Sequence, residues 1–258
     1  METAELDHLI ANLGKALFTN EELFGNLARQ EAKYISVDDL TYLRDKLHHP
    51  PPVHPDINEK ELRLGEWLAA CQFVIFELIY LLDAKALNLL ESIAFGEYDW
   101  TQANALEVIC RLYLDGKLPV ETISEIDSRL GKMRHETHLY FAQDLINRTQ
   151  RDPRFNQIIV QIKNIDFRLA LAELGYIQPM TREELIELGK RIIAVDGSSE
   201  EEIQKLMELF DKNVPHPSGS NLFYWPENYN SRIHDISQYN PTVEEIVDKC
   251  LGHKPIIL

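Results

Sequence analysis

The sequence predicts an all-α protein, and three observations carry that prediction. Apolar residues recur at spacings of three and four through most of the 258 residues, and no window shows the alternation expected of a half-buried strand. Glycine and proline, with 11 and 12 residues, are sparse and fall mainly between the periodic segments. Hydrophobic residues make up 45% of the chain, which is enough to form a buried core.

The charge balance narrows the classes of partner. The chain carries 42 acidic and 26 basic residues, a net charge of −16. An acidic surface repels DNA, RNA and anionic membranes, so it favours a basic protein as partner. Ordinary solubility is the simpler explanation of acidity taken alone, so charge by itself does not identify the partner.

No catalytic or cofactor-binding pattern is present in the sequence. It contains neither a phosphate-binding loop nor a nucleophile elbow. The segment Arg134 to His138 places two histidines three residues apart beside a glutamate, but this is not the HExxH pattern and is typical of a polar helix face. We therefore expect no enzyme, no cofactor and no metal site.

The cysteines and the apolar runs indicate a cytoplasmic protein. Cys71, Cys110 and Cys250 are far apart and odd in number, which favours reduced core thiols over a disulfide framework or structural zinc. The first five residues are acidic where a secretory leader would be basic. The most apolar run, residues 67–82, is 16 residues long and contains two polar side chains, so we expect a buried helix and not a membrane span, which needs about 20 apolar residues.

Helices are expected along most of the first 179 residues. Asn20 is a good N-cap for the second of them, and Ser36, Asp38 and Asp39 give the third a favourable first turn. Residues 48–55, HHPPPVHP, contain four prolines and are expected to be extended, which gives their histidines no fixed metal-binding geometry. The expected helices span 3–17, 20–32, 36–47, 59–82 (straight or kinked at Gly65), 84–94, 99–116, 119–130, 136–148 and 155–174.

The middle of this region is similar to the packing of HEAT-type or other α-solenoid proteins, although no clean repeat period is visible. Gly175 to Pro179 then interrupt the helical pattern, because Gly175 suits a helix end and Pro179 prevents continuation. We place a domain boundary here, between a helical domain of residues 1–177 and a second domain of residues 178–258. Residues 180–258 hold 14 acidic and 8 basic residues, a net charge of −6, so both parts are acidic.

The second domain has the pattern of a small helical bundle. Thr181 and Glu184 form a capping box at the start of its first helix. Ser198 or Ser199 caps the second helix, Pro215 stops it, and only one turn fits between residues 221 and 224. Asn240 and Pro241 begin the last helix. The expected core stripes are Leu185, Leu188, Ile192 and Ile193, then Leu206, Leu209 and Phe210, then Val243, Ile246, Val247 and Cys250 or Leu251.

Residues 181–258 resemble the colicin and pyocin DNase immunity proteins. The residues that carry the resemblance are Ser198-Ser199-Glu200-Glu201-Glu202, Leu206, Phe210, His216-Pro217-Ser218-Gly219-Ser220, Leu222 and Tyr224 to Pro226. The resemblance implies a four-helix inhibitor that binds a bacteriocin DNase of the HNH type beside its active site and so protects the producing bacterium. It covers roughly the last 30% of the chain.

The resemblance also implies a binding surface of two parts. The second helix would select the nuclease through Glu200, Ile203, Gln204, Met207, Glu208 and Asp211. The short third helix would anchor it through Asn221, Tyr224, Trp225 and Pro226. This division is physically reasonable, since desolvated aromatic anchors supply most binding energy while an acidic rim steers a basic partner.

The sequence departs from the family pattern in three places. Trp225 stands where a second tyrosine is usual, Asn221 stands where an aspartate is usual, and the C-terminal tail is short and lacks a tryptophan. Other interpretations of these residues also stand. Tyr224 and Trp225 are alternatively core aromatics, the acidic face a solvated helix surface, and His216 a packing or capping histidine.

The role of the first 177 residues is left open among three hypotheses. This region is a second immunity module against another toxin, an extension of the contact with the same nuclease, or a scaffold that mediates self-association. The alternative for the whole protein is an α-solenoid interaction scaffold whose C-terminal module has lost nuclease binding.

Overall fold

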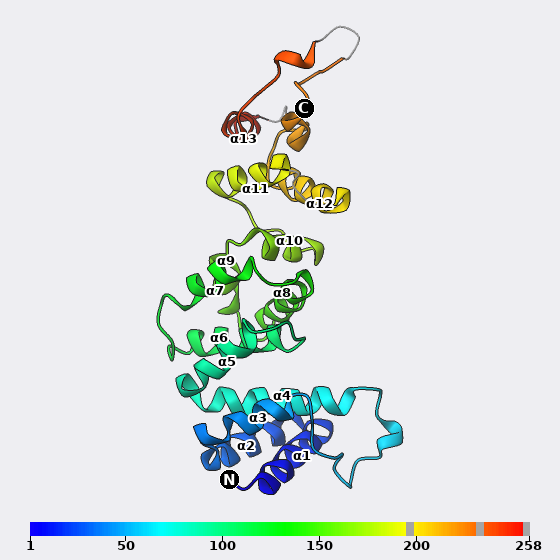
Figure 1. The fold of residues 1–258 in the computed structure, drawn as a ribbon, viewed down its shortest axis with the longest axis vertical. Helices are drawn as coiled ribbons and strands as arrows, with labels where there is room; N and C mark the ends of the chain where they lie inside the picture. Colours follow the sequence, from blue (N-terminus) through cyan, green and yellow to red (C-terminus); the bar gives the residue numbers. More distant parts are fainter. Residues whose placement is uncertain (195–198, 231–234, 255–258) are drawn as a thin grey trace. The chain divides into compact units, whose positions relative to one another are not determined.

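Every regular element of the described chain is helical (Figure 1). The computed structural model describes residues 1–194, 199–230 and 235–254. Within these ranges it contains 13 α-helices, several short 3-10 helices and no strand, which confirms the predicted all-α class. Contacts between residues divide the chain into two compact units, Met1–Ile159 and Val160–Leu258.

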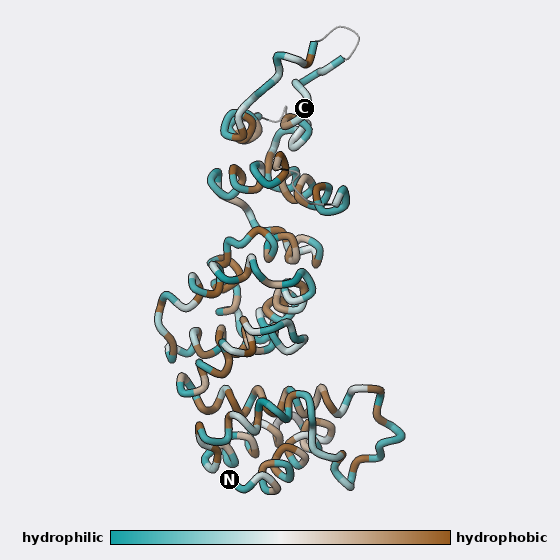
Figure 2. The backbone as a smooth tube through the Cα atoms, viewed as in Figure 1, coloured by the Kyte–Doolittle hydropathy of each residue, from teal (hydrophilic) through white to brown (hydrophobic). Residues whose placement is uncertain are grey.

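The first unit is built from helices that pack both on their sequence neighbours and on helices further along the chain. Helix α1 packs against α2 and α4, and α6 packs against α5 and α8. Hydrophobic and hydrophilic residues alternate along these helices (Figure 2), which is the pattern of helices that bury one face. The helices are α1 (Thr3–Thr19), α2 (Glu21–Glu31), α3 (Leu40–Lys46), α4 (Glu66–Leu81), α5 (Leu87–Ala94), α6 (Gln102–Leu114), α7 (Thr122–Leu130), α8 (His135–Thr149) and α9 (Phe155–Gln161), which spans the division.

The most apolar run of the sequence forms the buried helix α4, as predicted. Its residues Val74, Ile75, Leu78 and Ile79 are fully buried. No described helix combines the length and the apolar character that crossing a bilayer requires. The three cysteines are free and buried, also as predicted. Burial raises the pKa of Cys71 to about 12.

Two helices predicted from the sequence are too long, and both errors have a local cause. The helix expected over 59–82 begins only at Glu66, because Gly65 adopts a left-handed conformation with φ of 78°. The helix expected over 155–174 is two helices, α9 and α10 (Ile165–Glu173). Asn164 divides them: its side chain accepts a hydrogen bond from the N–H of Phe167 at 3.1 Å and caps a new helix.

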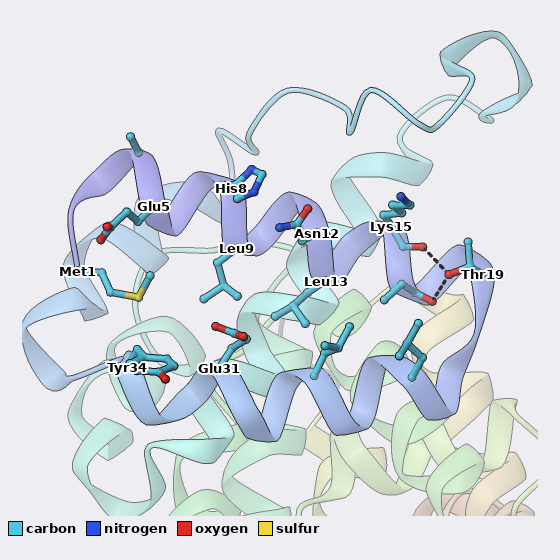
Figure 3. Close-up of a pocket in the computed structure, with 14 residues that line it drawn as sticks. Met1, Glu5, His8, Leu9, Asn12, Leu13, Lys15, Thr19, Glu31 and Tyr34 are labelled. Carbon is cyan, nitrogen blue, oxygen red and sulfur yellow. Dashed lines mark hydrogen bonds between the residues drawn. The ribbon is translucent and has the colours of Figure 1, made fainter.

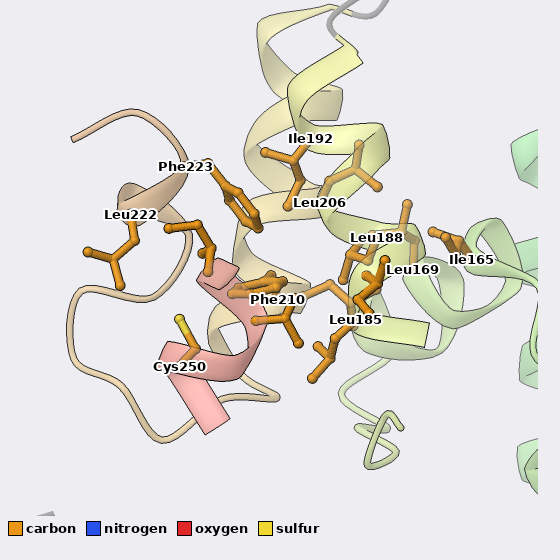
Figure 4. Packing of buried hydrophobic residues seen from close by; sticks show 14 residues of the cluster. Ile165, Leu169, Leu185, Leu188, Ile192, Leu206, Phe210, Leu222, Phe223 and Cys250 are labelled. Atoms are coloured by element: carbon orange, nitrogen blue, oxygen red, sulfur yellow. The ribbon is translucent and has the colours of Figure 1, made fainter. Parts of the chain in front are cut away.

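The second unit contains α10, α11 (Arg182–Ala194), α12 (Glu200–Asp211), the 3-10 helices η5 (Gly219–Phe223) and η6 (Ile236–Gln238), and α13 (Val243–Gly252). Its core gathers side chains from all four α-helices and from η5 (Figure 4). The predicted stripes of α11, α12 and α13 supply most of this core. Ile193 is the exception, since it lies on the exposed side of α11.

Helix α10 belongs to this second core, although it precedes the predicted domain boundary. Ile165 and Leu169 lie in the same apolar cluster as Leu185 (Figure 4). Outside the cluster, Arg168 Nη2 lies 3.3 Å from Glu184 Oε1. The compact unit therefore begins at Val160, whereas the predicted boundary at 177/178 marks where the family resemblance begins and stays a prediction.

Candidate partner-binding surface

Helix α12 is positioned by its cap and by its apolar side. The hydroxyl of Ser199 accepts a hydrogen bond from the N–H of Glu202 at 3.2 Å, so Ser199 is the N-cap; Ser198 lies outside the described residues. Three glutamates follow at the positive end of the helix, where carboxylates are stabilising. Leu206, Leu209 and Phe210 are buried in the core, which leaves the opposite side of α12 facing away from it.

The residues expected to select the nuclease lie along that outer side of α12. Glu200, Gln204 and Glu208 are exposed, and the Gln204 amide donates a hydrogen bond to Glu208 at 3.1 Å. Ile203 and Met207 are half-buried, and Met207 packs against the edge of the core. The structure therefore brings these five residues together as one acidic surface with an apolar edge, which we call the α12 face.

Asp211, the sixth predicted residue of this surface, is occupied by a structural role. Its Oδ1 accepts a hydrogen bond from the N–H of Ser220 at 2.6 Å, and its Oδ2 accepts one from the Ser220 hydroxyl at 3.1 Å. A Cβ on Gly219 would lie 2.1 Å from Asp211 Oδ1, so only glycine fits there. Asp211 and Ser220 are nine positions apart in the sequence, so the sequence analysis did not predict the hydrogen bonds between them.

The short third helix is η5, and it directs its apolar side chains inward. Leu222 and Phe223 are buried, and the Phe223 ring packs edge-on against Phe210 with centroids 5.0 Å apart. The side chain of Asn221 is exposed, while its carbonyl accepts hydrogen bonds from the N–H groups of Tyr224 and Trp225. This turn places the next two aromatic residues at the surface of the unit.

The two predicted anchor aromatics differ in burial. Tyr224 is half-buried and packs on the core, and its hydroxyl donates to the carbonyl of Ile192 at 3.0 Å. Burial raises the pKa of Tyr224. Trp225, by contrast, is 47% exposed, and the adjoining Pro226 is half-buried. Tyr224 thus fills part of the role of a core aromatic, whereas Trp225 presents an indole to solvent.

Comparison with known proteins identifies the family of this segment. Residues 177–236 match the model of the family described as colicin immunity protein / pyocin immunity protein. The uncharacterized protein YezA of Bacillus subtilis (strain 168) is 31% identical over 75 residues, which are 29% of this chain and 93% of YezA. The C-terminal segment of this chain belongs to the colicin and pyocin immunity protein family. No solved structure matches it. The family assignment made from the sequence is confirmed for its C-terminal segment, and the N-terminal unit is unassigned.

We call the segment from α11 to α13 the immunity domain, and its exposed tryptophan has an unpredicted neighbour. Tyr229 stacks on Trp225 with ring centroids 5.0 Å apart and an interplanar angle of 26°. A turn in which Asn228 has a φ of 58° brings the two rings together. They border a hollow of about 630 Å³ that is lined by Pro217, Ser218, Asn221, Leu222, Trp225, Pro226, Glu227, Asn228 and Tyr229. An aromatic residue four positions after Trp225 was the only sequence signal for this arrangement.

His216 of the immunity domain has a structural role. Its ring is buried, and its Nδ1 lies 3.1 Å from the N–H of Ser218 and accepts its hydrogen bond. Burial lowers the pKa of His216, against the opposing influence of Glu227. His216 therefore holds the start of η5, in agreement with a packing or capping histidine. In the described part of the chain, no three His, Cys, Asp or Glu side chains gather closely enough to hold a metal ion.

The α12 face carries negative charge that the protein itself neutralises only in part. Lys205 lies 3.2 Å from Glu201 and 3.4 Å from Glu173, so it neutralises two carboxylates that are not part of the α12 face. Glu202 is 4.0 Å from Arg191, whereas Glu200 and Glu208 have no cation within ion-pair distance among the described residues. Exposed carboxylates of this kind attract a basic partner and lose that attraction as salt rises.

The N-terminal unit has its own concave surface, a groove between α1 and α2. Figure 3 shows Leu9 and Leu13 pointing from α1 into this groove, with Glu31 and Tyr34 at one end. Its volume is about 880 Å³, and Leu23 and Leu27 of α2 also line it. The groove lies outside the residues of the family match, and the sequence interpretation did not single it out.

Proposed function

We propose that this protein is a bacteriocin immunity protein that binds and inhibits a colicin- or pyocin-type HNH DNase in the bacterial cytoplasm. The α12 face selects the nuclease, and Trp225 anchors it, flanked by Asn221, Tyr224 and Pro226. The protein acts by binding alone, without catalysis or a cofactor. One observation carries this proposal: an exposed indole and an acidic helix face both lie in the segment that belongs to the immunity family.

The exposure of Trp225 and of the α12 face indicates what each contributes to binding. Burying an exposed indole at the centre of an interface removes a large apolar area from water, so Trp225 is the expected hot spot. The carboxylates of Glu200 and Glu208 lie on the rim, where they raise the association rate more than the affinity. Tyr224 contributes chiefly by holding η5 against the carbonyl of Ile192.

The proposal is tested by inhibition of isolated nuclease domains. A panel of colicin- and pyocin-type DNase domains would be assayed for DNA cleavage with the full chain and with Trp225→Ala. We expect the full chain to inhibit at least one of them and Trp225→Ala to inhibit it far less. Val120→Ala, which removes an exposed apolar side chain of the N-terminal unit, is the matched control. Inhibition that is unaffected by Trp225→Ala would exclude the proposed anchor.

A second candidate function is an interaction scaffold whose immunity domain no longer binds a nuclease. The apolar groove between α1 and α2 favours it, because exposed apolar concavities commonly mark interaction sites. For the N-terminal unit, the three roles of second immunity module, extended nuclease contact and self-association all remain open. Nuclease inhibition by the full chain that is lost in a chain beginning at residue 160 would favour extended contact. Retained inhibition would favour the other two.

A further inference from the structure

The N-terminal unit contains a pocket whose charge is opposite to that of the chain. It lies where the end of α5, the start of α6, the end of α7 and the residue before α8 meet, and its volume is about 330 Å³. Three of its lining residues are cations, and none is acidic. The lining consists of Phe95, Gly96, Tyr98, Gln102, Arg129, Lys132, Met133 and Arg134.

Two of the three cations are held in place by aromatic rings. The Arg129 guanidinium carbon lies 3.5 Å from the centroid of the Phe95 ring, and that of Arg134 lies 4.0 Å from the centroid of the Tyr98 ring. Stacking on a ring fixes the plane of a guanidinium but leaves its N–H donors free along the edge. Both arginines are therefore preorganised as hydrogen-bond donors at the pocket.

The cations of this pocket are poorly neutralised by the protein. Arg129 approaches Glu91 only to 3.8 Å. Within the described ranges, Lys132 and Arg134 form no ion pair. Several other basic residues of the unit are closely paired: Arg154 lies 2.7 Å from Asp152, and other pairs are Arg111 with Glu77, Lys46 with Asp7 and Lys117 with Asp83.

The floor of the pocket is braced by a buried amide. The Gln102 side chain accepts a hydrogen bond from the Thr137 hydroxyl at 3.1 Å, and its amide nitrogen lies 3.4 Å from the carbonyl of Gly96. Gln102 and Thr137 are both buried, so this link joins the starts of α6 and α8. A bound group would thus contact a polar surface that these hydrogen bonds hold in place.

We propose that this pocket binds the phosphate group of a phosphorylated small molecule. Two guanidinium forks and one ammonium match the several oxygens of a phosphate dianion, which accepts charge-assisted hydrogen bonds from more than one side. The volume is at the lower end of the range for small-ligand sites, which suits a sugar phosphate or a nucleotide. Nucleic acid is disfavoured because the whole chain has a net charge of −16. This site is independent of nuclease binding.

The test is calorimetric titration of the full chain with phosphorylated compounds. The probes are pyrophosphate, ADP, ribose 5-phosphate and, as the uncharged comparison, adenosine. We expect saturable binding of at least one phosphorylated probe and none of adenosine. In the double variant Lys132→Gln, Arg134→Gln the affinity should fall about tenfold or more, because charge-assisted hydrogen bonds are lost. The matched control is Lys33→Gln, Lys60→Gln, which removes two exposed charges elsewhere in the same unit and should bind as the unchanged chain does.

The melting temperature of the double variant and a comparison with an acidic peptide complete the test. Both substituted side chains are exposed, so the double variant should melt at the temperature of the unchanged chain, which separates lost binding from lost folding. The proposal is wrong if no phosphorylated probe binds saturably, or if both double variants weaken binding equally. It is also wrong if a glutamate-rich peptide binds more tightly than every phosphorylated probe, since the pocket would then recognise an acidic protein segment.

Discussion

The carboxylate of Asp211 accepts two hydrogen bonds from Ser220, one from its N–H and one from its hydroxyl, at 2.6 and 3.1 Å. This relationship joins the last turn of α12 to η5, and so it couples the proposed partner-selecting surface to the turn that leads into the proposed anchor. Ser220 is fully buried, which makes its polar groups dependent on Asp211.

Substitution of Asp211 by alanine should lower the stability of the second unit. The N–H and hydroxyl of Ser220 would lose their acceptor in a buried position, at an expected cost of about 1–3 kcal/mol. Ser220→Ala removes only one of the two bonds and should cost less. Urea unfolding followed by circular dichroism measures both effects, with Glu187→Ala on the exposed side of α11 as the control. A loss for Asp211→Ala no larger than that of the control would refute the proposed link.

Trp225→Ala and Tyr224→Phe should separate binding from stability. Removal of the exposed indole should weaken binding of the nuclease by about 2 kcal/mol or more while leaving the unfolding midpoint unchanged. Tyr224→Phe removes the hydrogen bond to the carbonyl of Ile192 and should lower stability by about 1 kcal/mol. Surface plasmon resonance and thermal melts of the same samples provide the two readouts. The reverse pattern would mean that Tyr224 is the anchor and Trp225 a structural residue.

Leu169→Ala should destabilise the immunity domain although residue 169 lies outside the family match. Leu169 of α10 is buried in the same core as Leu185, so its truncation should cost about 2–4 kcal/mol. For the same reason, a fragment starting at residue 160 should be more stable than one starting at residue 176. Urea midpoints of the two fragments and of the full-length variant check this. Equal stability of the two fragments would show that the domain is complete without α10.

The stability of the N-terminal unit should fall as pH rises from about 4.5 to about 7. Burial raises the pKa of Glu107 to about 7 from its ordinary value of 4.5, against the opposing charges of Arg111 and Arg148. Between these two pKa values the folded chain retains a proton that the unfolded chain releases, so stability is lost as pH rises through that window. The expected loss is on the order of 3 kcal/mol.

Glu107→Gln tests this pH dependence, because glutamine imitates the protonated carboxyl at every pH. The variant should lose less stability than the unchanged chain when urea unfolding is compared at the two ends of the window. Some dependence should remain, since burial also raises the pKa of Asp144 to about 6. Glu97→Gln, at an exposed position, is the control. An unaltered pH profile in Glu107→Gln would contradict the assignment.

The features of this protein that the sequence predicted correctly are those encoded over a few residues. Thr181 and Glu184 form the expected capping box, Ser199 caps α12, and Leu206 and Phe210 are buried as their spacing requires. Caps and apolar periodicity act within one or two helical turns, so a single sequence contains the whole signal. The family resemblance added a prediction that local patterns could not make, namely which residues form the partner-binding surface. The binding role of that surface stays a prediction.

The tertiary structure decided the features that depend on residues distant in the sequence. Packing assigned α10 to the second core and engaged Asp211 with Ser220. It also placed Arg129 and Arg134 on the rings of Phe95 and Tyr98, which no local pattern indicates. A side chain's role in such places depends on which surfaces meet when helices pack, and that choice is made by the free energy of the whole core and not by the propensities of neighbouring residues.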